Sequence, residues 1–189
     1  MKLEQVRIRA AFHEAGHAVA ALRRGGYVTY INLTDPVKQL QETSTDIQTA
    51  DRAFMTWAGP WTQARWEGNP TMQRAIEILQ TQSFFDWKFY EKQFGNDVDA
   101  WADAAEEAQN SGQPMPENRP PVTPPLPGWF PVLDQAWPEI EQLANKLIRR
   151  KQRIELSNGR VLEKDGLYNQ WADFDHPKVV DDPSLPAVR

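Results

Sequence analysis

The sequence predicts a mainly α-helical fold with a small β element, in which a helix carrying an H-E-x-x-H motif packs against a helical bundle. Several segments repeat apolar residues at intervals of three and four, as amphipathic helices do, whereas residues 27–33 have the composition of a strand. The 189 residues suffice for one domain with a sizeable core. We assign this domain to residues 1–172, with a Pro-rich insertion at 111–131 and a polar tail at 173–189.

The first predicted helix runs from Leu3 to Arg24, a stretch without proline. Its apolar residues recur at spacings of four, three, four and three, and they are Ile8, Phe12, Ala15, Val19 and Leu22. Gly25-Gly26 ends the helix. Gly16 costs about 1 kcal/mol relative to alanine in a helix interior, so its presence indicates that another element approaches closely there.

A strand is predicted after these glycines, because residues 27–33 (YVTYINL) are rich in β-branched and aromatic side chains. Asp35-Pro36 is expected to end the strand. Residues 37–46 are polar and predict a loop.

Two long helices are expected next, at about 47–68 and 71–94. Gly59-Pro60 predicts a kink in the first of them, or a restart with Pro60 in a first turn. In the second, Asp86 occupies a position where the apolar period requires a core residue. A buried carboxylate is costly unless a partner compensates its charge, as a divalent metal would. Alternatively, Asp86 faces outward or pairs with a lysine or arginine.

The rest of the chain predicts a short helix at 97–109, an extended connection at 111–131, and a long helix at 134–154. A short extended piece at 160–162 and a last short helix at 165–171 follow.

The extended connection holds eight prolines, which exclude a regular helix. Its Pro120-Pro121-Val122-Thr123-Pro124 segment would suit a protein partner with an aromatic groove. A stiff surface connection explains the same composition.

Composition limits the function classes. The net charge of −5 gives no general attraction to nucleic acid or to an anionic membrane. Without cysteine, disulfides, thiol catalysis and thiolate zinc sites are excluded, so metal ligands must be His, Asp or Glu. No secretory signal and no apolar run of about 20 residues is present, so we expect a cytoplasmic protein that does not enter a membrane. The sequence does not predict the oligomeric state.

The most informative motif is His13-Glu14-Ala15-Gly16-His17. A helix turns by about 100° per residue, so His13 and His17 project from one face and both imidazoles can reach one metal ion. Glu14 lies beside them and can take a proton from a water without ligating the metal. The alternative is an ordinary amphipathic helix with two surface histidines.

Zinc bound by two histidines requires a third protein ligand and an open position. Asp86 is the first candidate, because it interrupts the apolar period of its own helix. Glu67, at the end of the preceding helix, and His176, in the polar tail, are the alternatives.

The stretch Ala11–Val19 resembles the peptidase domain of the FtsH-type ATP-dependent zinc proteases, in which H-E-A-G-H-A is followed by a strand and a helix with an A-G-x-x-A-E segment. The segment Trp57–Ala64 and the aspartate at 86 follow here in a similar order. The resemblance implies a zincin-like fold, Zn²⁺ held by His13, His17 and Asp86, and Glu14 as catalytic base.

The chain also departs from that family. Gly59-Pro60 is expected to break a helix that is continuous in that family, and the residues around Asp86 are aromatic where the family has small ones. No phosphate-binding loop of the G-x-x-x-x-G-K-[ST] type is present, so hydrolysis by this chain would not use ATP.

The expected function is therefore a zinc-dependent metalloendopeptidase that acts on a peptide or protein substrate. The strand at 27–33 would align that substrate by strand addition. One alternative is a regulatory metallopeptidase that cleaves a repressor. The other is a non-catalytic zinc module that binds a partner through the Pro-rich stretch.

Overall fold

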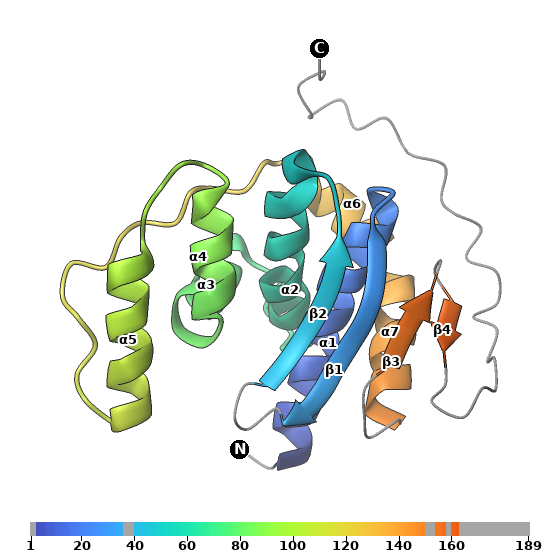
Figure 1. Cartoon of the computed structure of the whole chain (residues 1–189), viewed down its shortest axis with the longest axis horizontal. Helices are drawn as coiled ribbons and strands as arrows, with labels where there is room; N and C mark the ends of the chain where they lie inside the picture. The colour runs from blue at the N-terminus through green and yellow to red at the C-terminus, as the bar shows by residue number, and fades with distance from the viewer. Residues whose placement is uncertain (1–2, 36–39, 150–153, 158–159, 163–189) are drawn as a thin grey trace.

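The computed structural model describes residues 3–35, 40–149, 154–157 and 160–162. The fold is mainly helical with a small antiparallel sheet, as predicted (Figure 1). The helices are α1 (Leu3–Arg23), α2 (Arg52–Trp66, after a 3₁₀ turn at Thr49–Asp51), α3 (Met72–Gln82), α4 (Phe84–Lys92), α5 (Asp99–Ser111), α6 (Trp129–Gln135) and α7 (Trp137–Arg149). The strands are β1 (Tyr27–Asp35), β2 (Leu40–Asp46), β3 (Ile154–Ser157) and β4 (Arg160–Leu162).

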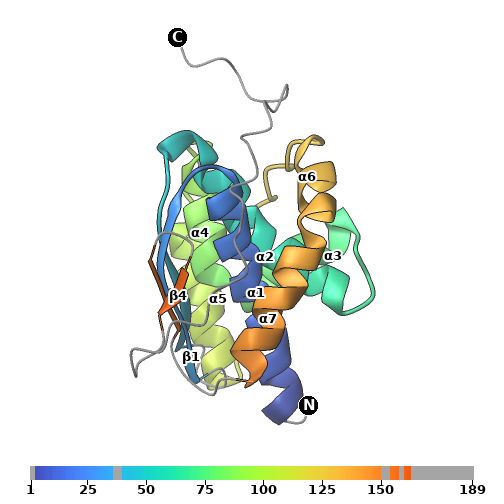
Figure 2. The same ribbon diagram turned by 90° about the vertical axis from the view of Figure 1, so that its right-hand side faces the viewer.

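The sheet has the strand order β2-β1-β3-β4, and every neighbouring pair is antiparallel. Helices α1 and α7 cover one face of it (Figure 2). The buried residues of β1 on this face are Val28, Ile31 and Leu33, and they pack with apolar residues of α1 and α7. The sheet and these two helices enclose one of the two apolar cores.

Helix α1 carries its predicted apolar stripe into this core, where Phe12, Ala15 and Val19 are buried. Its opposite side crosses α2 at Gly16. A Cβ atom at Gly16 would lie 2.4 Å from Thr62 Oγ1 and 2.7 Å from the carbonyl oxygen of Ala58. Glycine therefore permits the close approach that the sequence indicated.

Helices α2 to α6 enclose the second core, which is largely aromatic. Trp57, Trp87 and Tyr90 are fully buried in it. The Pro-rich connection lies against this core, because Val122 is buried and Tyr90 donates a hydrogen bond to the carbonyl of Thr123. The connection is thus held to the body of the protein at this point.

Helix α2 begins later than predicted and continues through Pro60 to Trp66. Of the two outcomes predicted at Gly59-Pro60, the restart is therefore wrong, and so is the expected break of a helix that is continuous in the FtsH-type peptidases. Proline removes one backbone donor and usually disrupts a helix. Here the buried residues on both sides of Pro60, Trp57 and Trp61 among them, hold the helix together by tertiary packing.

The single helix predicted for 71–94 is two helices, α3 and α4, separated at Ser83. Ser83 has φ −138° and ψ 55°, which is not helical. Asp86 therefore lies in the first turn of a new helix rather than in the middle of a long one.

The loop predicted for 37–46 is wrong for residues 40–46, which form the strand β2. Seven register pairs join β2 to β1, with irregularities between Val28 and Tyr30 and between Leu33 and Asp35. The polar composition concealed this strand, because its stability comes from pairing with β1 rather than from an apolar pattern of its own.

The helix predicted for 134–154 is also wrong at both ends, since α6 precedes it and Ile154 begins β3. The extended piece at 160–162 is strand β4, and the short helix predicted at 97–109 is α5. The helix predicted at 165–171, the tail at 173–189 and His176 lie outside the described residues. None of the helices in the described part of the chain is both long and apolar enough to cross a bilayer.

Candidate metal centre

Three side chains from two distant helices converge at one point. His13 and His17 lie one turn apart on α1, and Asp86 reaches them from α4. Asp86 Oδ2 is 2.9 Å from His13 Nε2 and 3.5 Å from His17 Nε2. The ligand atoms of this His-His-Asp cluster all lie within 4.8 Å of one another.

The other nitrogen of each imidazole faces an acceptor. His13 Nδ1 lies 3.1 Å from Gln63 Oε1, and His17 Nδ1 lies 2.9 Å from the carbonyl oxygen of Met55. In the neutral tautomer with its proton on Nδ1, each ring donates to this acceptor and keeps a lone pair on Nε2. Both Nε2 atoms face the carboxylate of Asp86, so in this tautomer two lone pairs and a carboxylate oxygen meet at one point.

Acceptor atoms this close repel one another unless a cation lies between them. Without a metal, a proton can fill this role. Burial would lower the pKa of His17, but the carboxylate of Asp86 opposes it and raises that pKa to about 9. Burial likewise would raise the pKa of Asp86, yet the two imidazoles hold it well below its usual range.

The cluster also fits a divalent metal. Four-coordinate zinc binds nitrogen and oxygen ligands at about 2.0–2.2 Å, which separates neighbouring ligand atoms by roughly 3.3 Å. The distances of 2.9 and 3.5 Å from Asp86 to the two imidazoles lie on either side of this value. The imidazoles are 8% and 7% exposed, whereas the Asp86 side chain is 21% exposed, so solvent reaches the cluster from the side of Asp86.

Glu14 lies beside the cluster and is not one of its members. Its side chain is buried, and its carboxylate accepts a hydrogen bond of 2.7 Å from the Thr43 hydroxyl on β2. Burial raises the pKa of Glu14, although the imidazoles of His17 and His13 and the hydroxyl of Thr43 act in the opposite direction. A carboxylate with a raised pKa is suited to accept a proton near neutral pH.

Gly59 of α2 forms the floor beneath the imidazoles. A Cβ atom at this position would lie 2.4 Å from both Cε1 and Nε2 of His17, and 2.8 Å from Nε2 of His13. Only a residue without a side chain leaves the rings where they are.

We therefore expect Gly59→Ala to impair metal binding more than folding. The imidazole of His17 can rotate away from the new methyl group, so the helix survives, and alanine favours a helix by about 1 kcal/mol. The rotation moves Nε2 out of the cluster, and zinc affinity should fall by about 10- to 100-fold. Isothermal titration and thermal unfolding of the metal-free protein measure the two effects.

Gly16→Ala is the matched control, since its methyl group would meet the backbone carbonyl of Ala58 at 2.7 Å. That carbonyl cannot rotate away, so the cost should appear as about 1–3 kcal/mol of lost stability. Equal zinc affinity in Gly59→Ala and the wild type would contradict the role assigned to Gly59.

The structure separates the three predicted candidates for a third ligand. It brings Asp86 to the two histidines, as described above. Glu67 instead accepts a hydrogen bond from Gln63 and pairs with Arg74. His176 lies outside the described residues.

Four residues at the site were missed by the sequence analysis, namely Thr43, Met55, Gly59 and Gln63. Thr43 lies in the segment predicted as a loop, and Met55 contributes a backbone carbonyl, which no sequence pattern reveals. Gly59 and Gln63 lie in the segment that resembles the peptidase family. The sequence signal that could have revealed these two residues was a glycine and a polar glutamine close to the tryptophans of a largely buried helix.

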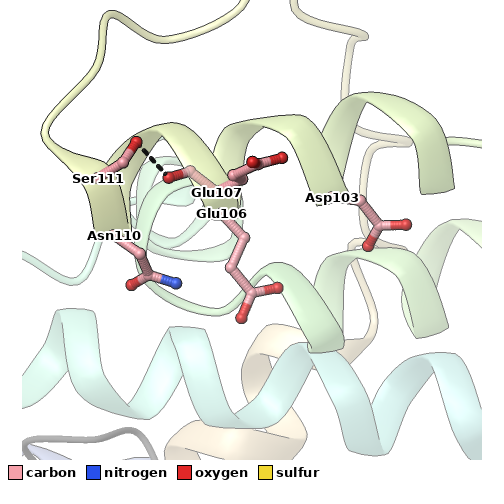
Figure 3. A pocket seen from close by; sticks show the side chains of 5 residues that line it. All are labelled: Asp103, Glu106, Glu107, Asn110 and Ser111. Atoms are coloured by element: carbon pink, nitrogen blue, oxygen red, sulfur yellow. Dashed lines mark hydrogen bonds between the residues drawn. The ribbon is translucent and has the colours of Figure 1, made fainter.

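A shallow hollow elsewhere on the surface is lined by Asp103, Glu106, Glu107, Asn110 and Ser111 of α5 (Figure 3). No member of the His-His-Asp cluster lines it. Asp103 pairs with Lys88 of α4 at 2.5 Å, and the Ser111 hydroxyl donates to the backbone carbonyl of Glu107. These carboxylates form an acidic face of a surface helix.

No protein-family model matches the sequence, and no curated protein matches it at a significant level. The likeness to FtsH-type peptidases therefore rests on the residues of this chain alone.

Proposed function

We propose that this protein is a zinc-dependent metallopeptidase with a zincin-like site. The observation that supports it is the convergence of His13, His17 and Asp86 beside a buried Glu14 that does not belong to the cluster. Two neutral imidazoles and one carboxylate are a ligand set used by catalytic zinc, which also requires an open position. The exposed side of Asp86 offers such an opening.

Zinc held by these three residues would supply Lewis acidity, which makes a water nucleophilic near neutral pH and polarises a peptide carbonyl. Glu14 would accept the proton of the attacking water and deliver it to the departing amine. Thr43 would hold the carboxylate of Glu14 in place during both transfers.

The strand expected to align the substrate has to be reassigned. The predicted strand at 27–33 is β1, which among the described residues pairs with β2 along its length and with β3 at Tyr30 and Ile31, so both of its edges already carry a partner strand. Among the described strands, β2 is the edge next to the site, because its Thr43 contacts Glu14. We infer that an extended peptide would add to β2.

A cytoplasmic location, an ATP-independent activity and a protein partner for the Pro-rich stretch remain predictions. The non-catalytic zinc module and the repressor-cleaving peptidase remain the alternatives.

Metal analysis combined with peptide hydrolysis tests the proposal. Purified protein should contain about one equivalent of zinc and should cleave an unfolded protein substrate such as casein, and a chelator should remove both properties. Zinc without hydrolysis would favour the non-catalytic module. Absence of zinc affinity would refute every zinc-dependent function.

Thr43→Val should slow peptide hydrolysis without weakening the binding of zinc. Valine matches the shape of threonine but cannot donate to Glu14, and a hydrogen bond to a charged group contributes about 1.5–3 kcal/mol. We expect kcat to fall by about 10- to 100-fold, with zinc affinity unchanged.

Thr43→Ser retains the hydroxyl and should recover most of kcat. Thr56→Val is the matched control, because it also removes a buried hydroxyl. The Thr56 hydroxyl donates its hydrogen bond to the carbonyl of Arg52 within α2 rather than to Glu14. Equal kcat in Thr43→Val and Thr56→Val would show that Thr43 has no part in the reaction.

A further inference from the structure

Both the oxygen and the nitrogen of the Gln63 side-chain amide form hydrogen bonds next to the candidate metal centre. Its side-chain oxygen faces Nδ1 of His13 at 3.1 Å, on the side of the ring away from Asp86. Its amide nitrogen donates to Glu67 Oε1 at 3.0 Å and to Gln82 Oε1 at 2.9 Å. Gln63 is only 3% exposed, so water does not compete strongly for these bonds.

Arg74 fixes the direction of these hydrogen bonds. Its Nε and one terminal nitrogen approach Glu67 Oε2 at 2.8 and 2.7 Å. A carboxylate paired with a guanidinium accepts hydrogen bonds and donates none. Gln63 must therefore turn its NH₂ group toward Glu67 and its oxygen toward His13, because the opposite orientation would place two oxygens in contact.

We propose that Gln63, Glu67 and Arg74 form a relay that holds the proton of His13 on Nδ1 and so keeps its Nε2 available as a metal ligand. The residues of the relay are positioning residues, since they act on the metal through His13. Glu67, a candidate ligand in the sequence analysis, would thus not bind the metal but would orient Gln63, which in turn contacts His13. The inference rests on the proposed zinc site.

The relay also determines the charge behind His13. The amide of Gln63 is neutral, so the hydrogen bond from Nδ1 leaves His13 a neutral ligand. A carboxylate in its place would draw the Nδ1 proton toward itself and give the imidazole partial negative charge. With one aspartate as the only charged residue among the three proposed ligands, a bound Zn²⁺ would keep a net positive charge. That charge is what lowers the pKa of a water at zinc.

Gln63→Met tests the relay, because methionine is similar in size but offers no amide. His13 would then lose its fixed tautomer, and loss of such an outer hydrogen-bond partner typically costs about 10- to 100-fold in metal affinity. Zinc affinity is measured by competition with a chromophoric chelator. Thermal unfolding of the metal-free variant reports whether the fold is retained.

Gln80→Met is the matched control. Gln80 is also buried, and its amide donates to the carbonyl of Pro120 at 2.7 Å, within the region that holds the Pro-rich connection. Its zinc affinity should stay within about threefold of the wild type, well below the loss expected for an outer partner. Equal zinc affinities of Gln63→Met and Gln80→Met would overturn the relay.

Nitrogen-15 NMR of the imidazoles shows which ring nitrogen carries the proton. This observation would not change if Gln63 only stabilised the fold. The chain has three histidines, so the ring signals can be assigned by single substitutions. In the zinc-loaded wild type, the His13 ring should carry its proton on Nδ1, protected from exchange. In Gln63→Met this proton should exchange rapidly. A His13 ring without a proton on Nδ1 in the wild type would contradict the relay directly.

The relay and the proposed function fail in different ways. If the wild type binds no zinc, the zinc function is refuted, and the relay is judged on the Asp86→Ala protein at a pH where the His13 ring is neutral, because the Asp86 carboxylate would otherwise compete for a proton on Nε2. An Nδ1 proton in this variant that is lost when Gln63→Met is added would support the relay. The same tautomer in both proteins would overturn it.

Discussion

Glu14→Gln is expected to abolish peptide hydrolysis while leaving zinc in place. Glutamine cannot accept the proton of the attacking water, and general acid–base catalysis contributes about 10²- to 10⁴-fold to a rate. Zinc should stay bound, because Glu14 is not among the three residues whose ligand atoms converge. The amide oxygen of glutamine can still accept the hydrogen bond from Thr43.

The stability of this variant should equal or exceed that of the wild type at neutral pH. Burial raises the pKa of Glu14, which means that the folded state disfavours its ionised form. A neutral glutamine removes that cost. The measurements are kcat/KM on an unfolded substrate, zinc content and the midpoint of thermal unfolding.

Glu91→Gln is the matched control for a buried glutamate. Glu91 is 0% exposed and accepts hydrogen bonds from the backbone N–H and the hydroxyl of Thr123 and from the Asn96 amide. Its replacement should lower stability and leave turnover by the folded fraction unchanged. If Glu14→Gln retained wild-type turnover, Glu14 would not be the base.

The three residues of the His-His-Asp cluster were accessible to sequence reasoning because each leaves a local signal. Helical geometry alone places His13 and His17 on one face of α1. Asp86 was conspicuous because a charged residue interrupts an apolar stripe. Its interpretation as part of a continuous helix was nevertheless wrong, since Ser83 starts a new helix three residues earlier.

The supporting residues depend on how distant elements cross, and local patterns do not report this. Gly59 matters because α1 and α2 lie so close that a Cβ atom at this position would overlap the imidazoles. Thr43 reaches Glu14 only because β2 pairs with β1 and returns along α1. Gln63 finds its partners on α1 and α3. Their roles therefore follow from tertiary packing rather than from periodicity.

The second large effect is expected for Asp86→Ala, which should reduce zinc affinity by at least about 100-fold. Loss of an outer hydrogen-bond partner already costs about 10- to 100-fold, and Asp86 would be a direct ligand and the one negative charge in the cluster. The two imidazoles alone would leave the metal weakly held. Chelator competition measures the affinity, and hydrolysis should disappear in parallel.

Asp103→Ala is the control for removal of an aspartate, because Asp103 is 63% exposed and pairs with Lys88 at the surface. Exposed pairs contribute only about 0–1 kcal/mol, so this variant should bind zinc as the wild type does. Glu67→Ala provides the opposing test, since Glu67 was the alternative ligand. If Glu67→Ala lowered the zinc affinity more than Asp86→Ala does, Glu67 rather than Asp86 would be the third ligand. The reverse order, with hydrolysis lost in Asp86→Ala, is what the 2.9 and 3.5 Å contacts of Asp86 with the two imidazoles imply.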